Sequence, residues 1–155
     1  KGVPEITKSE TMQQIRDLVK EDPKAIWLVV DMAYPATNIP AMAGADCLNT
    51  TQTYPQKTRW EMLNQEGECE DIYNRYCHIR ASLGSKTMLE LVSTDYVEVT
   101  LSPEDLKKLN IRYIVSTNDF DEKILTGITN IFTESGIEFQ KYYEGTQLSI
   151  YRCVY

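Results

Sequence analysis

The sequence has little of several features whose absence excludes classes of protein. It has one histidine and seven glycines in 155 residues. It has no run of the roughly 18 to 20 apolar residues that a membrane-spanning helix needs, and no signal-peptide core. Gly-rich phosphate-binding motifs, the GxSxG nucleophile motif and the HExxH zinc motif are also missing. We therefore predict no cofactor and no resident metal.

Basic residues are too few for nucleic acid to be a partner. The formal net charge is −7, which repels phosphate backbones unless a local basic patch overrides it. The densest basic stretch is Lys107-Lys108 with Arg112, and it is interleaved with Glu104 and Asp105. A composition of 42% hydrophobic and 25% charged residues is that of an ordinary globular protein, and the length suits one domain, 1–155.

Four cysteines leave the redox state open. None forms a CxxC pair, which argues against a zinc knuckle or a thioredoxin motif. Free thiols and up to two disulfides are both compatible with the pattern, and a stable disulfide would place the domain outside the cytosol. The cysteines are Cys47, Cys69, Cys77 and Cys153.

The chain begins at Lys1, and its first methionine, Met12, lies inside a predicted helix. We therefore expect it to be a piece of a longer protein. Helical spacing of apolar residues predicts an amphipathic helix over 7–21, with Thr7 and Glu10 as a capping box. The apolar run 25–30 then predicts a strand buried on both faces.

The middle of the chain is irregular and the second half is regular. Residues 31–56 are rich in Pro, Asn, Thr and Ala and predict a long excursion, followed by a short helix from Lys57. Later strands are predicted at 87–93, 96–101 and 111–116, and helices at 103–110 and 121–134. Residues 137–143 and 147–154 predict a hairpin. The fold class predicted is α/β, a mixed sheet with helices packed on it in an αβα-like sandwich, ending in an antiparallel hairpin.

The segment 73–79 concentrates chemistry, because it contains the only histidine beside a thiol, a guanidinium and two tyrosines. Adjacent strand residues point to opposite faces, so Cys77 and His78 do not form a nucleophile and base pair there. Tyr73 and Arg75 share one face with Cys77. Rings and a guanidinium suit a carbohydrate or phosphate site, although a packed interior segment with Arg75 paired to a carboxylate such as Asp71 fits the pattern better.

Three stretches together resemble a known kind of domain. They are 38–44 leading to Asn49, the Thr53-Tyr54-Pro55 motif and Trp60; then 73–79; and then 109–116 before the closing hairpin. Their order is similar to that of the soluble C-terminal tail of bacterial polytopic membrane proteins related to GT-C-type glycosyltransferases. Cys77 departs from that pattern, which has a small residue such as alanine.

The resemblance implies a non-catalytic, extracytoplasmic domain of a multi-pass membrane protein in glycan or cell-envelope assembly. Its partners would be the membrane domain of its own parent chain and a glycan or lipid-linked sugar. Two alternatives stay open: a self-contained hydrolase using the Asp31 to His78 region, and a structural protein-interaction module. The candidate binding residues are Asn38, Asn49, Trp60, Tyr73, Asn74, Arg75, Tyr76 and His78, and no catalytic residue is assigned.

Overall fold

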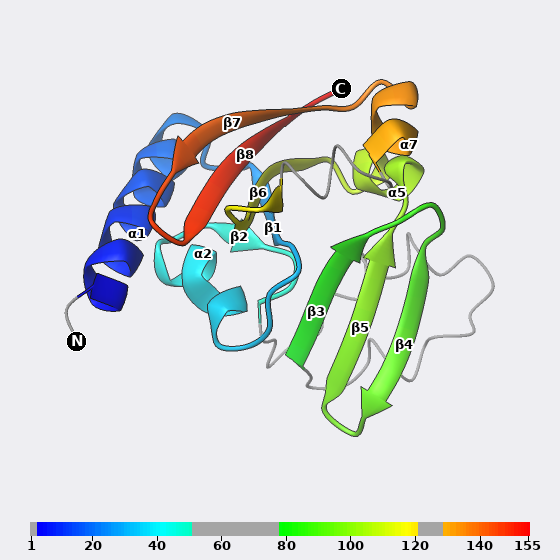
Figure 1. Cartoon of the computed structure of the whole chain (residues 1–155), viewed down its shortest axis with the longest axis horizontal. Coiled ribbons are helices and arrows are strands. Elements are labelled where there is room, and N and C mark those ends of the chain that lie inside the picture. Colours follow the sequence, from blue (N-terminus) through cyan, green and yellow to red (C-terminus); the bar gives the residue numbers. More distant parts are fainter. Residues whose placement is uncertain (1–2, 51–77, 121–128) are drawn as a thin grey trace.

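The chain folds into two β-sheets with helices packed on them (Figure 1). The computed structural model describes residues 3–50, 78–120 and 129–155. The first half contains α1 (Val3–Glu21), β1 (Ile26–Val29), η1 (Ala36–Asn38), α2 (Ile39–Met42) and β2 (Asp46–Cys47). The second half contains β3 (His78–Leu83), β4 (Met88–Ser93), β5 (Tyr96–Leu101), α5 (Pro103–Lys108), β6 (Ile111–Thr117), α7 (Thr129–Glu134), β7 (Glu138–Glu144) and β8 (Leu148–Val154).

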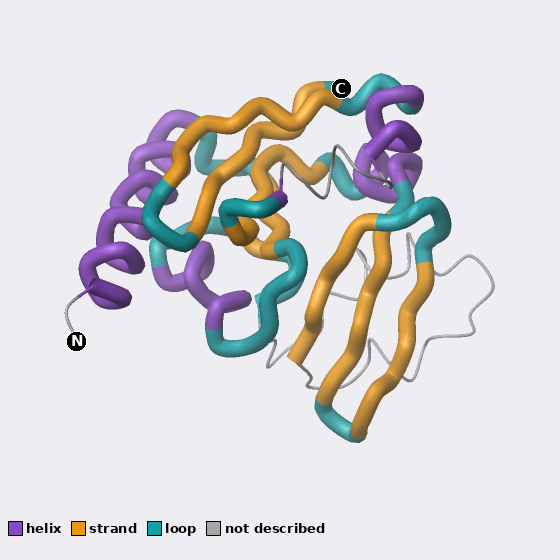
Figure 2. Tube along the Cα trace, in the orientation of Figure 1, coloured by secondary structure: helices purple, strands orange, loops and turns teal. Residues whose placement is uncertain are grey.

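The larger sheet has five strands in the order β2-β1-β6-β8-β7, and the smaller has three in the order β3-β5-β4. β2, β1 and β6 run parallel, whereas β6, β8 and β7 are antiparallel neighbours. Figure 2 shows the strands in two separate groups. The predicted α/β class, the mixed sheet and the C-terminal hairpin are confirmed.

The central strands β1 and β6 of the five-stranded sheet are apolar along most of their length and are buried on both faces. Trp27 and Val29 of β1 face one core with Ile15 and Leu18 of α1. Leu28 and its neighbour Val30 face the other core, which α5, α7 and the inner side of the three-stranded sheet complete. Successive side chains of a strand alternate between faces, so a continuous apolar run fills two cores at once.

Among the described residues, the three-stranded sheet packs against a core on one side only. In β5, Val97, Val99 and Leu101 are buried, while Tyr96, Glu98 and Thr100 point the other way and are partly or fully exposed. β3 alternates in the same manner. This is the pattern of an amphipathic strand with one face on a core and one toward solvent.

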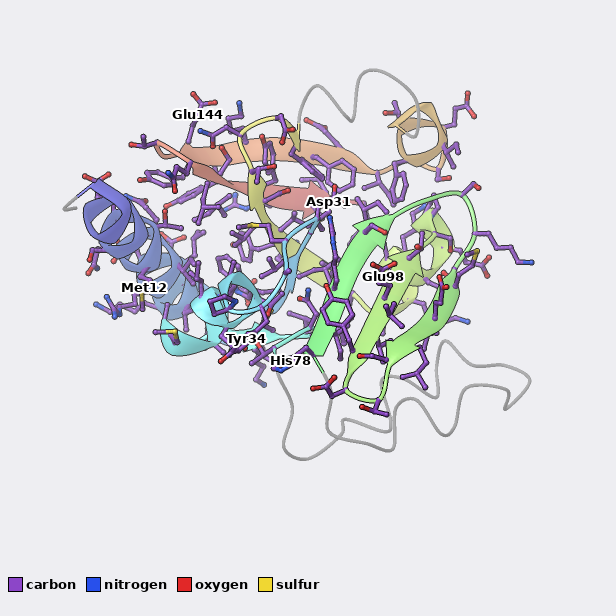
Figure 3. The ribbon with its side chains drawn as sticks, turned by 60° about the horizontal axis from the view of Figure 1, so that its bottom comes forward. Met12, Asp31, Tyr34, His78, Glu98 and Glu144 are labelled. Atoms are coloured by element: carbon purple, nitrogen blue, oxygen red, sulfur yellow. The ribbon has the colours of Figure 1, made fainter. Side chains whose placement is uncertain are left out.

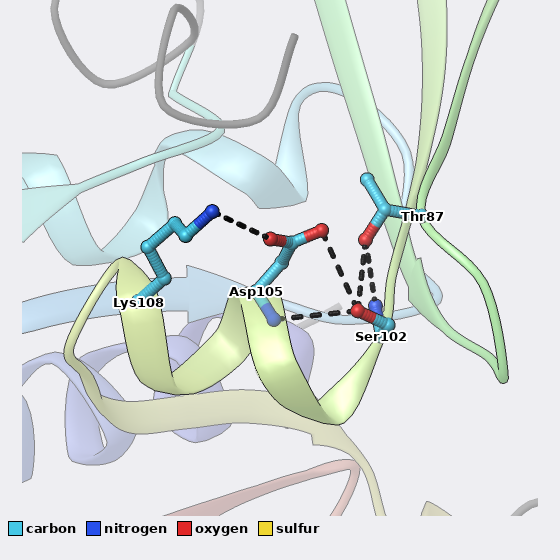
Figure 4. Close-up of polar contacts among 4 residues, drawn as sticks. All are labelled: Thr87, Ser102, Asp105 and Lys108. Atoms are coloured by element: carbon cyan, nitrogen blue, oxygen red, sulfur yellow. Dashed lines mark hydrogen bonds and ion pairs between the residues drawn. The ribbon is translucent and has the colours of Figure 1, made fainter. Parts of the chain in front are cut away.

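Local signals place α5 where the sequence predicts it. Ser102 is the N-cap, and its hydroxyl accepts a hydrogen bond from the Asp105 backbone N–H. Pro103 occupies the first turn, where a missing N–H costs nothing. Thr87 joins the cap through its hydroxyl, which ties the start of α5 to the start of β4 (Figure 4).

Two local predictions are wrong. The first helix begins at Val3, so Thr7 lies within it and is not a cap; Pro4 is compatible with the first turn of a helix. The described part of the predicted excursion, 31–50, contains η1, α2 and β2. Pro40 lies at the start of α2, and Ile39 and Ala43 are buried against α1 and β1, so this proline-rich stretch is packed structure.

Candidate functional site

The structure describes three of the eight predicted binding residues: Asn38, Asn49 and His78. The other five lie outside the described residues, and so does the helix predicted from Lys57. They are Trp60, Tyr73, Asn74, Arg75 and Tyr76.

Asn49 is fully buried and its amide is engaged within the fold. Its Oδ1 accepts from the Val29 N–H at 2.9 Å, and its Nδ2 donates to the Val29 carbonyl at 2.7 Å and to the Ile79 carbonyl at 3.5 Å. The side chain thus pairs with β1 as a neighbouring strand would. A buried polar group with these partners stabilises the fold, and we assign Asn49 a structural role.

The position of Asn49 explains how β1 serves both sheets. Along one edge of β1, β2 pairs with Ile26 and Trp27, and the Leu48 N–H reaches the Trp27 carbonyl at 2.8 Å. Asn49 then occupies the Val29 position. Beyond it, Val30 bridges to Ala81 of β3, and the Asp31 N–H donates to the Ala81 carbonyl at 2.8 Å. Asn49 therefore fills the gap between two partner strands.

Asn38 ends η1 and is the N-cap residue of α2. It is half-buried, and its side chain makes no capping hydrogen bond to that helix. The structure therefore gives no geometric support for Asn38 as a binding residue.

His78 opens β3 and lies against an aromatic ring that the sequence does not connect with it. The ring centroids of His78 and Tyr34 are 4.3 Å apart and the planes are tilted by 39°. Tyr34 is 51% exposed, and Figure 3 shows the two side chains beside each other at the start of β3. The pair presents an aromatic surface to solvent.

The rest of the solvent-facing side of the three-stranded sheet follows from strand register; we name it the outer face. His78 stands opposite Tyr96, and Arg80 stands opposite Glu98. The next pair, Ser82 and Thr100, is joined by a hydroxyl hydrogen bond of 3.3 Å. The inner-facing residues between them, Ile79 and Ala81, are buried. Rings, a guanidinium, a carboxylate and hydroxyls thus lie in adjacent rows.

β4 adds a second carboxylate to the outer face. Glu90 is directly opposite Glu98 in the antiparallel pairing, and both are exposed. Opposed like charges on neighbouring strands are unfavourable by roughly 0.2 to 1 kcal/mol. The row Arg80, Glu98, Glu90 contains one positive and two negative groups.

Asp31 and His78 lie at different positions along β3. It has a left-handed backbone, with φ of 60°, and its N–H bonds Ala81, three residues along β3 from His78. At about 3.3 Å of rise per residue, the two positions are separated by about 10 Å along the strand. The spacing does not support a hydrolase site of the Asp31 to His78 region in which the Asp31 carboxylate and His78 converge.

The two described thiols are poor nucleophiles. Cys47 and Cys153 are free and buried. Burial raises the pKa of the Cys47 thiol to about 11 and that of Cys153 to about 12. Because the thiolate is the reactive form, neither group suits thiol catalysis.

Polar side chains at the end of β6 and just after it also hold the fold together. The Ser116 hydroxyl donates to the Val30 carbonyl at 2.8 Å. The Asn118 amide donates to the carbonyls of Gly145 and Thr146 and accepts from the Ser149 hydroxyl, which fixes the turn of the hairpin.

A shallow hollow lies between α5 and the end of α7, lined by Glu104, Lys107, Lys108 and Ser135. Its lysines have partners, because Lys107 donates to the Ser135 carbonyl and Lys108 lies 4.0 Å from Asp105. The polar groups of this hollow therefore connect α5 to the end of α7, and we do not assign a ligand site there. Across the described ranges, we find no group of three or more His, Cys, Asp or Glu side chains placed to hold a metal ion. No helix among the residues described is both long and apolar enough to cross a membrane.

Sequence reasoning missed Tyr34, Arg80, Tyr96 and Glu98. For Arg80 a signal was present, because strand alternation from His78 places it on the same face. Tyr96 and Glu98 alternate likewise within a predicted strand. Nothing local predicts that they pair with 78–80, or that Tyr34 packs on His78, because the first contact depends on the parallel pairing of β3 with β5 and the second on how β3 docks beside the chain that follows β1.

No curated protein and no solved structure matches this chain significantly. A family model does match, and it covers residues 5–155, nearly the whole length. The chain belongs to the family described as Domain of unknown function (DUF7654).

Proposed function

We propose that this domain is a non-catalytic, extracytoplasmic part of a multi-pass membrane protein of glycan or cell-envelope assembly, and that it binds or presents a glycan on the outer face. Bracing of the parent's membrane domain is the other role the resemblance suggests. The resemblance of 38–60, 73–79 and 109–116 to GT-C-associated tails supports the setting.

The observation that carries the binding role is the Tyr34 and His78 ring pair, with Tyr34 half exposed. Sugars present apolar C–H faces and a ring of hydroxyls. An exposed aromatic surface beside a guanidinium, a carboxylate and hydroxyls offers both stacking and hydrogen bonds to such a ligand. Arg80, Glu98, Ser82 and Thr100 supply the polar groups in register with the rings.

The alternatives receive less support. A hydrolase using the Asp31 to His78 region would need His78, Arg75 and a carboxylate to converge in a pocket, and the Asp31 backbone lies about 10 Å along β3 from His78. A protein-interaction module would use 38–55 as a flat exposed surface. The described part of this stretch, 38–50, is instead largely packed into the core that contains side chains of α1 and β1. Exposed Met88 and Val92 on β4 are the feature that such a module would retain.

The test is a titration of cell-envelope oligosaccharides against wild type, Tyr34→Ala and Tyr34→Phe. Loss of the ring should weaken binding about fivefold or more, while phenylalanine should keep most of it. Tyr142→Ala is the matched control, since Tyr142 is a 41% exposed tyrosine on β7. Equal affinity of wild type and Tyr34→Ala for every glycan tested would remove the ring pair from the site.

Arg75→Ala and Trp60→Ala extend the titration to two predicted residues outside the described ranges. The membrane setting has its own check in the full reading frame. A parent without several hydrophobic helices before Lys1 would contradict it, whatever the glycan titration gives.

A further inference from the structure

The charge of the outer face restricts which glycan can bind there, and this inference rests on the proposed function. Among the described residues of β3, β4 and β5 that face outward, Arg80 is the one lysine or arginine. Glu98 and Glu90 are exposed in the same row, and Asp95 is exposed in the turn that bonds the His78 N–H. Carboxylates therefore outnumber cations beside the rings.

The position of Arg80 matters as much as the count. Its backbone stands opposite that of Glu98 on the neighbouring parallel strand, about 4.8 Å away by strand spacing. The Glu98 carboxylate therefore offsets part of the positive potential that Arg80 gives this face. Glu90, on the far side of Glu98, has another carboxylate as its cross-strand partner. The row consequently offers negative potential at Glu90 and little positive potential to attract an anion.

The aromatic groups also favour a positively charged ligand. Tyrosine rings attract cations through their negative faces, and Tyr34 and Tyr96 flank His78 in the adjacent row. The net charge of −7 adds a weaker repulsion of anions by the whole chain. Phosphate groups and uronic acids would thus meet carboxylates, whereas an ammonium group would meet carboxylates and ring faces.

We propose that the outer face selects a glycan bearing protonated amino groups over a neutral one, and a neutral glycan over an anionic one. Stacking on Tyr34 and His78 holds the sugar ring, and Glu90 with Glu98 discriminates by charge. The site therefore takes amino sugars or amine-substituted sugars in preference to uronate polymers or sugar phosphates.

The probe is one tetrasaccharide backbone in three forms: cellotetraose, its 6-amino derivative and its C6-oxidised uronate. Each is titrated at about pH 7.5, where alkyl amines are protonated and carboxylates ionised. We expect the amino form to bind about threefold more tightly than the neutral form and the uronate about threefold more weakly. The differences should shrink as ionic strength rises from about 0.01 M to about 0.15 M, because salt screens exposed charges.

Glu90→Gln is the decisive variant. It should reduce the ratio of amino to uronate affinity about threefold and leave affinity for the neutral tetrasaccharide within about twofold. Glu138→Gln is the matched control, because Glu138 is an exposed strand glutamate on β7 of the other sheet, and it should leave the ratio unchanged.

The outcomes separate this inference from the proposed function. Binding that depends on Tyr34 but favours the uronate, or a ratio that Glu90→Gln does not move, overturns the charge selection and leaves glycan binding intact. Absence of binding to all three forms and to the cell-envelope glycans overturns both. A wild-type-like melting temperature for Glu90→Gln would show that the variant is folded.

Discussion

The two sheets differ in how many faces of their central strands are buried. β1 and β6 are apolar along most of their length, and their side chains fill cores on both sides. β3 and β5 alternate, so only one side is buried. In the five-stranded sheet, side chains on both faces of the central strands are buried and stabilise the fold. The three-stranded sheet has a face whose residues the fold does not dictate, and the rings and charges lie there.

The largest expected effect tests the burial of the central strands of the larger sheet. Ile114 of β6 is fully buried, and Ile114→Ala should lower the free energy of unfolding by about 2 to 5 kcal/mol through lost burial and a cavity. Val92 on β4 is 55% exposed, and Val92→Ala should change it by less than about 1 kcal/mol. Urea unfolding of both variants measures the contrast. Similar losses would mean that the two sheets do not differ as described.

The junction between the sheets gives the next effect. Asn49→Ala removes the partners of both Val29 backbone groups and should cost about 1 to 3 kcal/mol. Gln13→Ala is the control: its amide bonds Asp17 at 3.0 Å on the exposed side of α1, and its loss should cost under about 0.5 kcal/mol. If both variants unfold at the same urea concentration, the Asn49 amide does not stabilise the junction.

The buried thiols of the larger sheet predict a change confined to alkaline pH. Desolvation raises the pKa of Cys47 to about 11 and that of Cys153 to about 12, from 9.0. A group whose pKa is higher in the folded state stabilises fully below its unfolded pKa and loses that contribution as pH rises. Stability should therefore fall as the pH rises from about 9 toward 12.

Cys153→Ala should flatten this alkaline slope relative to wild type, and chemical denaturation at a series of pH values measures it. Residue-resolved alkylation provides a second readout, since Cys47 and Cys153 should react only when the fold opens. Rapid alkylation of either thiol in the native protein at pH 8 would contradict their burial.

The smallest expected effect belongs to the outer face. Glu90→Gln removes one of two opposed carboxylates and should raise the free energy of unfolding by about 0.2 to 1 kcal/mol. The gain should diminish in high salt. A loss of stability in low salt would show that Glu90 has a favourable partner, and would weaken the argument for charge selection.

Features encoded by neighbouring residues were predictable. The Ser102-Pro103 start of α5, the apolar run of β1 and the Ser135-Gly136 end of α7 all follow from local rules, and Gly136 adopts the left-handed backbone, with φ of 82°, that such an end requires. Where Pro40 suggested irregular chain, the structure has a helical turn, because burial of Ile39 outweighs the weak local signal.

The candidate site was less predictable because it depends on contacts between distant segments. His78 was singled out from the sequence, but its ring partner Tyr34 is 44 positions earlier and follows a different strand. Asn49 was predicted to bind a ligand, yet its amide pairs with Val29, 20 residues away. Composition can suggest which residues matter, but the role of each depends on which strands become neighbours.

The Asn49 junction also connects segments that are far apart in the sequence. Asn49 bonds Val29, 20 positions earlier, and the Ile79 carbonyl, 30 positions later, so a single side chain ties β1 to β3. The entropy of closing a loop rises only logarithmically with its length, at about 0.6 kcal/mol per doubling. The long sequence separation of these contacts therefore adds little to the free-energy cost of forming the junction.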